Sequence, residues 1–347
     1  MPDGDRLTLR STEALLRAGL VAPVDATALR AVEARYAVAV PAAFRALIGH
    51  PDDPIGRQVI PHPDELITAA HEAADPIADE ALSPVAGIVH RYADRVLLKP
   101  LLVCPLYCRF CFRREQVGPD GGLLSPAQMD AALDYIRARP AIREVILTGG
   151  DPLLLSPRRL GELLAALDDM PQLDQIRIHS RVPVAEPGLV TAALLAALRV
   201  EKPLYLAVHA NHALEFSAQA AAALRALAGA GAVLLGQSVL LRGVNDSAAA
   251  LEDLFRAMLR HRVKPYYLHQ LDPAPGTARF HVPIAEGQAL LAALRGRVTG
   301  LAWPTYVLDI PGGHGKVPVG PGYLDRRGGV TDPGGMTHPL AGPHAGG

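Results

Sequence analysis

Three cysteines stand close together in the segment Cys104-Pro-Leu-Tyr-Cys108-Arg-Phe-Cys111, and the chain contains no other cysteine. Thiolates are soft ligands that select iron–sulfur clusters, zinc or Cu(I). A cubane cluster usually takes four thiolates, so three of them leave one iron without a protein ligand and free to bind a small molecule. Catalytic metal sites keep such an open position, whereas structural zinc sites close theirs. The C-x3-C-x2-C spacing therefore favours a catalytic iron–sulfur site; a zinc loop completed by a histidine and three unrelated thiols are the alternatives.

The segment that leads into this cysteine loop is one of a series of apolar runs typical of β-strands. These runs cover residues 95–103, 144–148, 175–179, 204–208, 232–238 and 264–269. Amphipathic helical patterns follow them, at residues 125–139, 156–167, 187–198, 213–228, 248–261 and 286–294. Short strands alternating with helices predict parallel β/α units. Six such units are too few for an eight-stranded barrel, so we predict an α/β fold with a partial (β/α)6 TIM-like barrel at residues 86–326.

The two ends of the chain differ from this barrel region. Residues 1–85 show helical spacing but few large apolar residues, which predicts an accessory helical region packed on the barrel. Residues 327–347 are rich in glycine, proline and histidine. Such a composition buries too little apolar surface to fold, and it predicts a disordered tail.

Composition excludes several classes of protein. The 34 basic and 35 acidic residues give a net charge of −1, so there is no basic surface typical of nucleic-acid binding. No apolar run reaches the roughly 18 residues of a membrane span, and the first residues lack the layout of a signal peptide. Clustered cysteines fit a reducing compartment better than a disulfide framework. We therefore predict a cytoplasmic protein with neither a membrane nor a nucleic-acid partner.

Glycines and polar residues stand where the predicted strands end. Thr148-Gly149-Gly150-Asp151-Pro152 follows the second strand, His209 ends the fourth and Gln237 ends the fifth. Glycine allows close approach of the backbone to a ligand. Because the C-terminal ends of parallel strands carry the site in β/α folds, we expect these residues to face one cavity. Taken singly, each of them is more often an ordinary turn or strand-end residue.

A second glycine-rich segment, Asp309-Ile-Pro-Gly-Gly-His-Gly-Lys316-Val, lies near the end of the barrel region. A phosphate-binding loop would need glycine at 310 and serine or threonine at 317, but Ile310 and Val317 stand there. A lysine among glycines and prolines can instead provide the amine of a Schiff base with pyridoxal phosphate. From this segment alone, an exposed loop lysine is the alternative.

Together these motifs resemble the lysine 2,3-aminomutase family of radical S-adenosylmethionine enzymes, over about residues 40 to 325. The motifs that carry the resemblance are Cys104–Arg114, Gly149–Pro152, Ile178–Pro183, Gln237–Asp246, Pro265–Asp272 and Asp309–Lys316. The resemblance implies the radical SAM type of partial barrel and a [4Fe-4S] cluster bound by Cys104, Cys108 and Cys111. It also implies S-adenosyl-L-methionine and pyridoxal 5'-phosphate as cofactors.

The resemblance implies roles for further residues. Lys316 is the catalytic lysine that binds pyridoxal phosphate, and Arg113 is the clamp on the substrate carboxylate. Asp272 and Asp309 bind the distal ammonium of L-lysine, which is reasonable because two carboxylates select a cationic tail. The implied contacts to S-adenosylmethionine are Gly149, Gly150, Asp151, His209 and Gln237. The implied ligands of the pyridoxal phosphate group are Arg91 and Arg95, for which a solvated basic edge is the alternative.

The implied reaction is an isomerisation of L-lysine to β-lysine by 2,3-migration of the amino group. It calls for an electron donor such as flavodoxin or ferredoxin, and a homo-oligomer is compatible with it. His269 stands where the free-lysine mutases usually carry tyrosine, and it is more similar to the relative that makes β-lysine for elongation factor P. That dedicated use and a related amino acid 2,3-aminomutase stay open. So do a pyridoxal enzyme with a non-redox metal and a zinc-binding non-radical protein.

Overall fold

The computed structural model describes residues 7–118, 121–324 and 329–339. Its main feature is a nine-stranded sheet in the order β1 to β9, in which the strands from β2 to β8 are parallel. The parallel strands are β2 (Arg95–Leu101), β3 (Glu144–Gly149), β4 (Gln175–Ser180), β5 (Leu204–His209), β6 (Val233–Val239), β7 (Lys264–His269) and β8 (Thr305–Ile310). The six predicted strands are all present, and the predicted partial barrel is confirmed. The strand β8 was not predicted.

An antiparallel strand lies at each edge of the sheet. β1 (Ile88–Tyr92) pairs with β2, and β9 (Gly315–Pro318) pairs with β8. The turn between β8 and β9 is built on Gly312 and Gly313, whose φ angles are 81° and 82°. Glycine adopts such a left-handed backbone without the strain that a side chain would cause. The glycine-rich segment is therefore first of all a tight turn that returns the chain beside β8.

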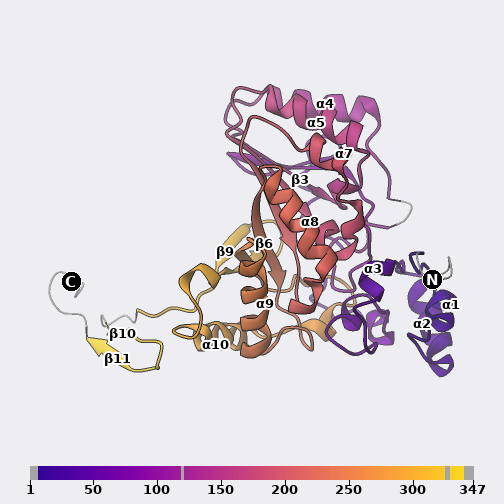
Figure 1. Ribbon diagram of the computed structural model, residues 1–347, viewed down its shortest axis with the longest axis vertical. Helices are drawn as coiled ribbons and strands as arrows, with labels where there is room; N and C mark the ends of the chain where they lie inside the picture. The colour runs from indigo at the N-terminus through magenta and orange to yellow at the C-terminus, as the bar shows by residue number, and fades with distance from the viewer. Residues whose placement is uncertain (1–6, 119–120, 325–328, 340–347) are drawn as a thin grey trace.

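Helices cover the outer face of the sheet (Figure 1). They are α4 (Pro126–Arg137), α5 (Pro157–Asp168), α6 (Val182–Ala185), α7 (Ala192–Ala197), α8 (Ala218–Gly229), α9 (Ala248–Arg260) and α10 (Ile284–Leu294). A capping box fixes the start of α4: the Ser125 hydroxyl accepts the Gln128 backbone N–H, and the Gln128 side chain accepts the Ser125 backbone N–H. Short 3-10 helices occur at η2 (Pro23–Asp25), η3 (Gly56–Gln58), η4 (Pro63–Leu66), η5 (Pro152–Leu154), η6 (Pro187–Leu189), η7 (Ala213–Glu215), η8 (Ala278–Phe280) and η9 (Gly300–Ala302).

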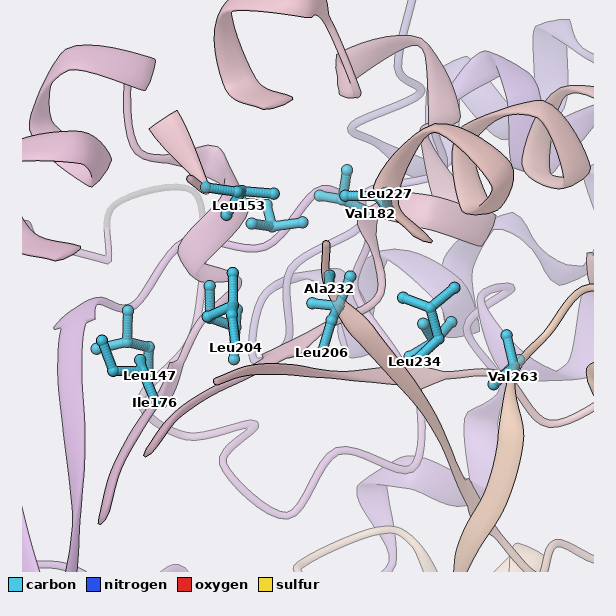
Figure 2. Close-up of a cluster of buried hydrophobic side chains, with 14 of the residues drawn as sticks. Leu147, Leu153, Ile176, Val182, Leu204, Leu206, Leu227, Ala232, Leu234 and Val263 are labelled. Carbon is cyan, nitrogen blue, oxygen red and sulfur yellow. The ribbon is translucent and has the colours of Figure 1, made fainter. Parts of the chain in front are cut away.

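The main core lies between the sheet and these helices. Successive side chains of a strand point to opposite faces, so alternate residues pack outward against the helices. Figure 2 shows part of this core, with Leu206 of β5 and Leu234 of β6 on the side of the sheet that faces Leu227 of α8. The next residue along each strand, Ala207 after Leu206 and Leu235 after Leu234, lines the inside of the barrel. The same alternation turns the polar strand-end residues toward the interior.

The N-terminal segment packs against the mouth of the barrel. Its helices are α1 (Thr12–Arg17), α2 (Ala26–Glu33) and α3 (Ala42–Arg45), and residues 46–87 are mostly irregular. Phe44, Ile55 and Val59 of this segment share a buried cluster with Leu106 of the cysteine loop. The loop that carries the cysteines is thus held between the barrel and the N-terminal segment.

The end of the chain differs from the predicted disordered tail. Within residues 327–347, β10 (Gly329–Thr331) and β11 (Thr337–Pro339) form an antiparallel hairpin that projects from the body of the molecule (Figure 1). Its turn is closed by Asp332, which accepts hydrogen bonds from the Met336 backbone at 3.0 Å and from His338 Nε2 at 2.7 Å. This hairpin is formed by backbone pairing and the contacts of one aspartate, which composition does not reveal. Residues 327–328 and 340–347 lie outside the described residues. No helix in the described chain is both long and apolar enough to cross a bilayer.

Candidate active site

A cavity of about 880 Å³ fills the inside of the barrel. All of the residues singled out by sequence line it: Arg91, Arg95, Cys104, Cys108, Cys111, Arg113, Gly149, Gly150, Asp151, His209, Gln237, Asp272, Asp309 and Lys316. They come from β1, β2, β3, β5, β6, β8 and β9 and from the loops that follow the parallel strands. A cavity of this size is in the range of pockets that enclose cofactors and small substrates.

The three cysteines lie on the loop after β2, and each is free and partly buried. Burial raises the pKa of all three, that of Cys111 to about 11. Such thiols become thiolates when a cation such as iron binds them. No group of three histidine, cysteine or acidic side chains within the described residues converges closely enough to hold a single metal ion. A cluster does not require such convergence, because each thiolate binds a different iron atom.

A buried carboxylate anchors the cysteine loop. Glu65 is fully buried and accepts hydrogen bonds from Arg109 Nε at 3.0 Å and from Arg114 Nη2. Burial opposes ionisation of Glu65, but the two guanidinium groups outweigh it and keep its pKa below the usual value. Arg114 also donates to the backbone oxygens of Pro275 and Gly276 at 3.2 and 3.3 Å. The loop is therefore fixed on both sides before any cofactor binds.

The segment after β3 packs tightly against the start of the cysteine loop. A Cβ atom on Gly150 would lie 2.2 Å from the backbone oxygen of Val103, and one on Gly149 would lie 2.8 Å from that of Leu101. Both glycines are thus required by close backbone packing, in addition to any approach to a ligand. Asp151 accepts hydrogen bonds from Ser180 Oγ at 2.8 Å, from the Arg181 backbone at 2.7 Å, and from the Leu153 and Val182 backbones. Its carboxylate holds the turn after β4 in position.

His209 and Gln237 end β5 and β6 with their side chains toward the cavity, as the sequence predicted. His209 Nε2 is buried and has no hydrogen-bond partner among the described residues, and the same is true of Nε2 of His179 and His269. Burial lowers the pKa of His179 and His209 well below the ordinary value, so both rings are neutral at pH 7. Buried polar atoms rarely stay without partners, and these atoms fit a polar ligand in the cavity.

Lys316 lies at the other end of the site, on β9. Its ammonium forms an ion pair with Asp309 and lies 3.1 Å from His269 Nδ1, and its backbone N–H donates to the Tyr92 hydroxyl at 2.7 Å. Burial lowers the pKa of His269 to about 4, so the ring is neutral and accepts the hydrogen bond from Lys316. Burial would raise the pKa of Asp309, but contacts with His269 and Lys316 hold it well below the usual value. Lys316 is therefore not an exposed loop lysine.

Asp272 follows β7 and differs from Asp309 in its electrostatics. Its Oδ1 atom is buried without a hydrogen-bond partner among the described residues. Burial and the negative charge of Asp309 raise its pKa to about 7. Two acids with such different environments form a site in which one carboxylate is paired and the other awaits a cation.

Arg113 and Arg91 share one buried carboxylate that the sequence did not reveal. Arg113 donates from Nε at 2.8 Å and contacts from Nη2 at 2.7 Å the same Oδ2 atom of Asp79, and Arg91 Nη2 lies 3.3 Å from Oδ1. The ammonium of Lys99 lies 3.9 Å from Asp79. Nη1 of Arg113 has no partner among the described residues. Three cations around one carboxylate leave an excess of positive charge at the wall of the cavity.

Arg95 occupies a less buried position than Arg91. It donates to Asp94 at 2.7 Å, and its guanidinium stacks over the ring of Tyr92 at 3.7 Å. Its side chain is one-third exposed, yet it lines the same cavity. Both arginines that were predicted to bind a phosphate group thus reach the site, one from each of the first two strands.

Some residues of the site were missed by the sequence-based reasoning. Asp79 lies in an irregular segment, next to Ala78 with a φ of 55°, and no local pattern marks it. Arg181 belongs to the Ile178–Pro183 motif, which predicts no role for it, and it contacts Cys108 Sγ at 2.8 Å. Its place just after β4 was a usable signal, because the other site residues occupy the same position on their strands. The sequence marks His269 as a departure from the family pattern, but it does not show that His269 is a neighbour of Lys316.

The barrel and its three-cysteine loop define a radical SAM protein, and a family model described as the radical SAM superfamily matches residues 98–254. A second model, described as lysine-2,3-aminomutase, matches residues 291–328, which include the Lys316 hairpin. The chain belongs to the lysine 2,3-aminomutase family.

Several relatives support this assignment. The chain is 41% identical to the L-lysine 2,3-aminomutase of Clostridium subterminale over 274 residues, which cover 79% of this chain and 66% of the relative. It is 35% identical to a putative L-lysine 2,3-aminomutase of Aquifex aeolicus over 308 residues, 88% of this chain and 83% of that one. It is also 36% identical to the glutamate 2,3-aminomutase of Clostridioides difficile, over 80% of this chain and 65% of the relative. The chain thus spans about two thirds of the length of the clostridial relatives.

Among solved structures, a radical SAM methyltransferase from Sphaerobacter thermophilus is similar, with a TM-score of 0.43 and 21% identity. The match covers 64% of this chain and 68% of the methyltransferase.

Membership of the lysine 2,3-aminomutase family implies a [4Fe-4S] cluster, S-adenosyl-L-methionine and pyridoxal phosphate. The residues present fit these groups: three thiols on one loop, unpartnered buried polar atoms along the cavity, and one partly buried lysine at its far end.

Proposed function

We propose that this protein is an isomerase that converts L-lysine to β-lysine by moving the amino group from C2 to C3. The observation that carries the proposal is the arrangement of one cavity with three thiols at one end and Lys316 beside Asp272 and Asp309 at the other. The homology to L-lysine 2,3-aminomutases supports it.

The residues present divide the cofactors between them. Cys104, Cys108 and Cys111 would hold the [4Fe-4S] cluster, Lys316 would bind pyridoxal phosphate, and Arg91 and Arg95 would bind its phosphate group. When bound, the cluster with S-adenosylmethionine supplies a hydrogen-abstracting radical, and pyridoxal phosphate supplies the ring system that assists the migration. The protein excludes water and holds the reacting groups in position.

Binding of S-adenosylmethionine would use the polar strand ends. The Nε2 atom of His209 is buried at the cavity wall and has no hydrogen-bond partner among the described residues. Gln237 lines the cavity from the neighbouring strand. Gly149 and Gly150 would expose backbone groups beside the cysteine loop. Asp151 would act by fixing the turn after β4, since its hydrogen bonds go to that turn and to Leu153.

Recognition of lysine would rest on charge at both ends of the substrate. Arg113 uses Nε and Nη2 on Asp79, which leaves Nη1 for the substrate carboxylate. Asp272 and Asp309 would bind the distal ammonium, and they would repel an acidic side chain. In the free protein the ammonium of Lys316 already pairs with Asp309. Binding of Lys316 to pyridoxal phosphate would release Asp309 from this pair, and its carboxylate would then be available to the ammonium of the substrate.

We further infer that a one-electron donor such as flavodoxin or ferredoxin reduces the cluster. Three reduced cysteines and an oxygen-sensitive cluster suit the cytoplasm. The inferences about the electron donor and about the cytoplasm both require the cluster, and a protein without a cluster would overturn both.

The experiment that tests the function is turnover of L-lysine by the anaerobically purified protein after addition of iron and sulfide. The mixture contains S-adenosylmethionine, pyridoxal phosphate and dithionite, and the products are separated by chromatography. β-Lysine formed in the complete mixture and absent when any component is left out supports the proposal. An intact cluster that cleaves S-adenosylmethionine without forming β-lysine overturns the substrate assignment, and L-glutamate then becomes the first alternative. A protein that binds no reducible cluster overturns the whole proposal.

A further inference from the structure

A buried arginine contacts one of the three cysteines directly. Arg181 follows β4, is 6% exposed, and donates from Nη1 to Cys108 Sγ at 2.8 Å. Its other terminal nitrogen, Nη2, donates to Gln58 Oε1 at 2.5 Å and to Glu215 Oε2 at 3.1 Å. One guanidinium therefore joins the thiol to a buried carboxylate.

The carboxylate partner is held as firmly as the arginine. Glu215 is fully buried in η7, after β5. Its Oε1 atom accepts hydrogen bonds from the Asn211 backbone at 2.8 Å, the His212 backbone at 3.0 Å and Gln58 Nε2 at 3.1 Å. Glu215 thus forms a fixed negative charge behind Arg181.

Aromatic rings and the backbone also fix the guanidinium. The Cζ atom of Arg181 lies 5.2 Å from the ring centre of Phe44 and 5.6 Å from the ring centre of Phe110. The backbone N–H of Arg181 donates to Asp151 at 2.7 Å. The guanidinium cannot leave the sulfur without breaking its contacts with Gln58 of the N-terminal segment and Glu215 of η7.

Charge and hydrogen bonds near the sulfur ligands set the reduction potential of an iron–sulfur cluster. Reduction adds one electron to the cluster, so a nearby cation stabilises the reduced form and a nearby anion destabilises it. We propose that Arg181 and Glu215 together set the reduction potential of the cluster through Cys108, with Arg181 raising the potential and Glu215 limiting that rise. This inference rests on the proposed function, because it requires the cluster.

The two members of the pair have opposite expected effects. The Arg181→Met variant loses the cation and the hydrogen bond to Cys108, and Glu215 is left without its counter-charge. We expect its midpoint potential to fall by at least 59 mV, a tenfold change in the one-electron equilibrium. The Glu215→Gln variant keeps the contact between Arg181 and Cys108 but loses the opposing charge, and we expect its potential to rise. If Arg181 and Glu215 only stabilised the fold, both variants would be less stable, and their midpoint potentials would not shift in opposite directions.

A second buried ion pair on the same strand offers a matched control. Arg177 of β4 pairs with Glu144 at 3.0 and 2.7 Å, and both side chains are nearly buried. It lies four residues before Arg181, about 13 Å along an extended strand. The Arg177→Met variant should lose a comparable ion pair and leave the midpoint potential close to that of the wild type.

The test is a potentiometric titration of the reconstituted full chain without S-adenosylmethionine, followed by electron paramagnetic resonance of the reduced cluster. Iron and sulfide are counted, and folding is checked by circular dichroism. A lower potential in Arg181→Met and a higher one in Glu215→Gln, with Arg177→Met unchanged, support the inference. Unshifted potentials, or shifts of the same sign in both variants, overturn it.

The same titration separates this inference from the proposed function. A wild-type protein that takes up no cluster defeats the proposed function itself. If Arg181→Met does not assemble a cluster, the Arg181→Lys variant replaces it, because it keeps the charge but cannot bridge Cys108 and Glu215 as a fork does. A potential for Arg181→Lys equal to that of the wild type then overturns the role of the hydrogen bond to Cys108.

Discussion

Asp309 and Lys316 stand opposite each other in the antiparallel pair of β8 and β9, and their side chains meet in an ion pair inside the barrel. The register of the hairpin alone brings them together, because a slip by one residue would turn Lys316 to the other face of the sheet. The turn glycines Gly312 and Gly313 permit this register. The position of the Lys316 amine is therefore set by turn geometry.

Replacement of Lys316 tests its role as the amine that binds pyridoxal phosphate. We expect Lys316→Ala to lose covalent labelling by pyridoxal phosphate after borohydride reduction, with at least a thousandfold loss of activity, since the amine is a reacting group. Iron content should stay unchanged, because Lys316 does not contact the cysteines. The control is Lys264→Ala, which removes a lysine bonded to the backbone oxygens of Pro265 and Trp303. Labelling that persists in Lys316→Ala contradicts the assignment.

The raised pKa of Asp272 predicts a pH dependence of substrate binding. Its pKa is about 7 in the folded chain, against 3.8 for an ordinary aspartate, so the folded site is protonated below pH 7. A lysine ammonium binds the ionised form, and its affinity should fall as pH decreases through 7, by up to about tenfold per unit. Measurement of KM for L-lysine against pH checks this, and Asp272→Asn should give a weaker but flatter profile. A KM that is constant between about pH 6 and 8 in the wild type would exclude this role for Asp272.

The same pKa has a defined sign for stability. Because the folded pKa exceeds the unfolded one, the unfolded chain ionises first as pH rises from about 4 to about 7. The contribution of Asp272 to the free energy of unfolding is therefore present below about pH 4 and is lost by about pH 7. Chemical denaturation of the wild type and Asp272→Asn at both pH values would reveal the difference.

Glu65 is predicted to stabilise both the fold and the cysteine loop. Glu65→Gln leaves Arg109 and Arg114 buried without a counter-charge, and loss of one partner of a buried ion pair costs about 3–5 kcal/mol. We expect a lower unfolding midpoint in denaturant and less iron bound per chain. Asp174→Asn is the matched control, because its ion pair with Arg143 is half exposed and worth about 0–1 kcal/mol. Equal destabilisation by the two variants would refute the anchoring role.

Asp79 is predicted to orient Arg113 for the substrate carboxylate. In Asp79→Asn the contact with Arg113 becomes a weaker hydrogen bond, and we expect KM for L-lysine to rise about tenfold, equivalent to about 1.4 kcal/mol. Iron content and labelling by pyridoxal phosphate should be retained. Asp94→Asn removes the exposed partner of Arg95 and should leave KM for lysine within about twofold. A normal KM in Asp79→Asn would show that Arg113 does not need this carboxylate.

The sequence allowed the parallel strands β2 to β7 to be predicted, because each is an apolar run followed by a helix. It did not allow β8 to be predicted, since Pro304 and the polar Thr305 interrupt its start. The edge strands β1 and β9 depend on antiparallel partners, and single-strand patterns do not report pairing. The site residues at strand ends were predictable from the fold class and the resemblance together.

Asp79 and Glu65 were beyond reach for a different physical reason. Both lie before β1, Asp79 in an irregular segment and Glu65 in the four-residue 3-10 helix η4, where no periodicity marks a buried position. Asp79 pairs with Arg113, which lies 34 residues further along the chain. Glu65 pairs with Arg109 and Arg114, which lie 44 and 49 residues further along. A buried acid can be recognised only when the cations that neutralise it are known, and that information is tertiary.

The hydrogen bond from the Lys316 backbone to the Tyr92 hydroxyl joins β9 to β1, the two opposite edges of the described sheet. Between β1 and β9 the described strands are thus joined by the hydroxyl group of a tyrosine side chain and not by a ladder of backbone hydrogen bonds. Such a contact can open and reclose without disturbing the ladders on either side. The backbone amide of Lys316 should therefore exchange with deuterium faster than the hydrogen-bonded amides of β7. Its exchange rate would report how often β1 and β9 separate to admit bulky ligands.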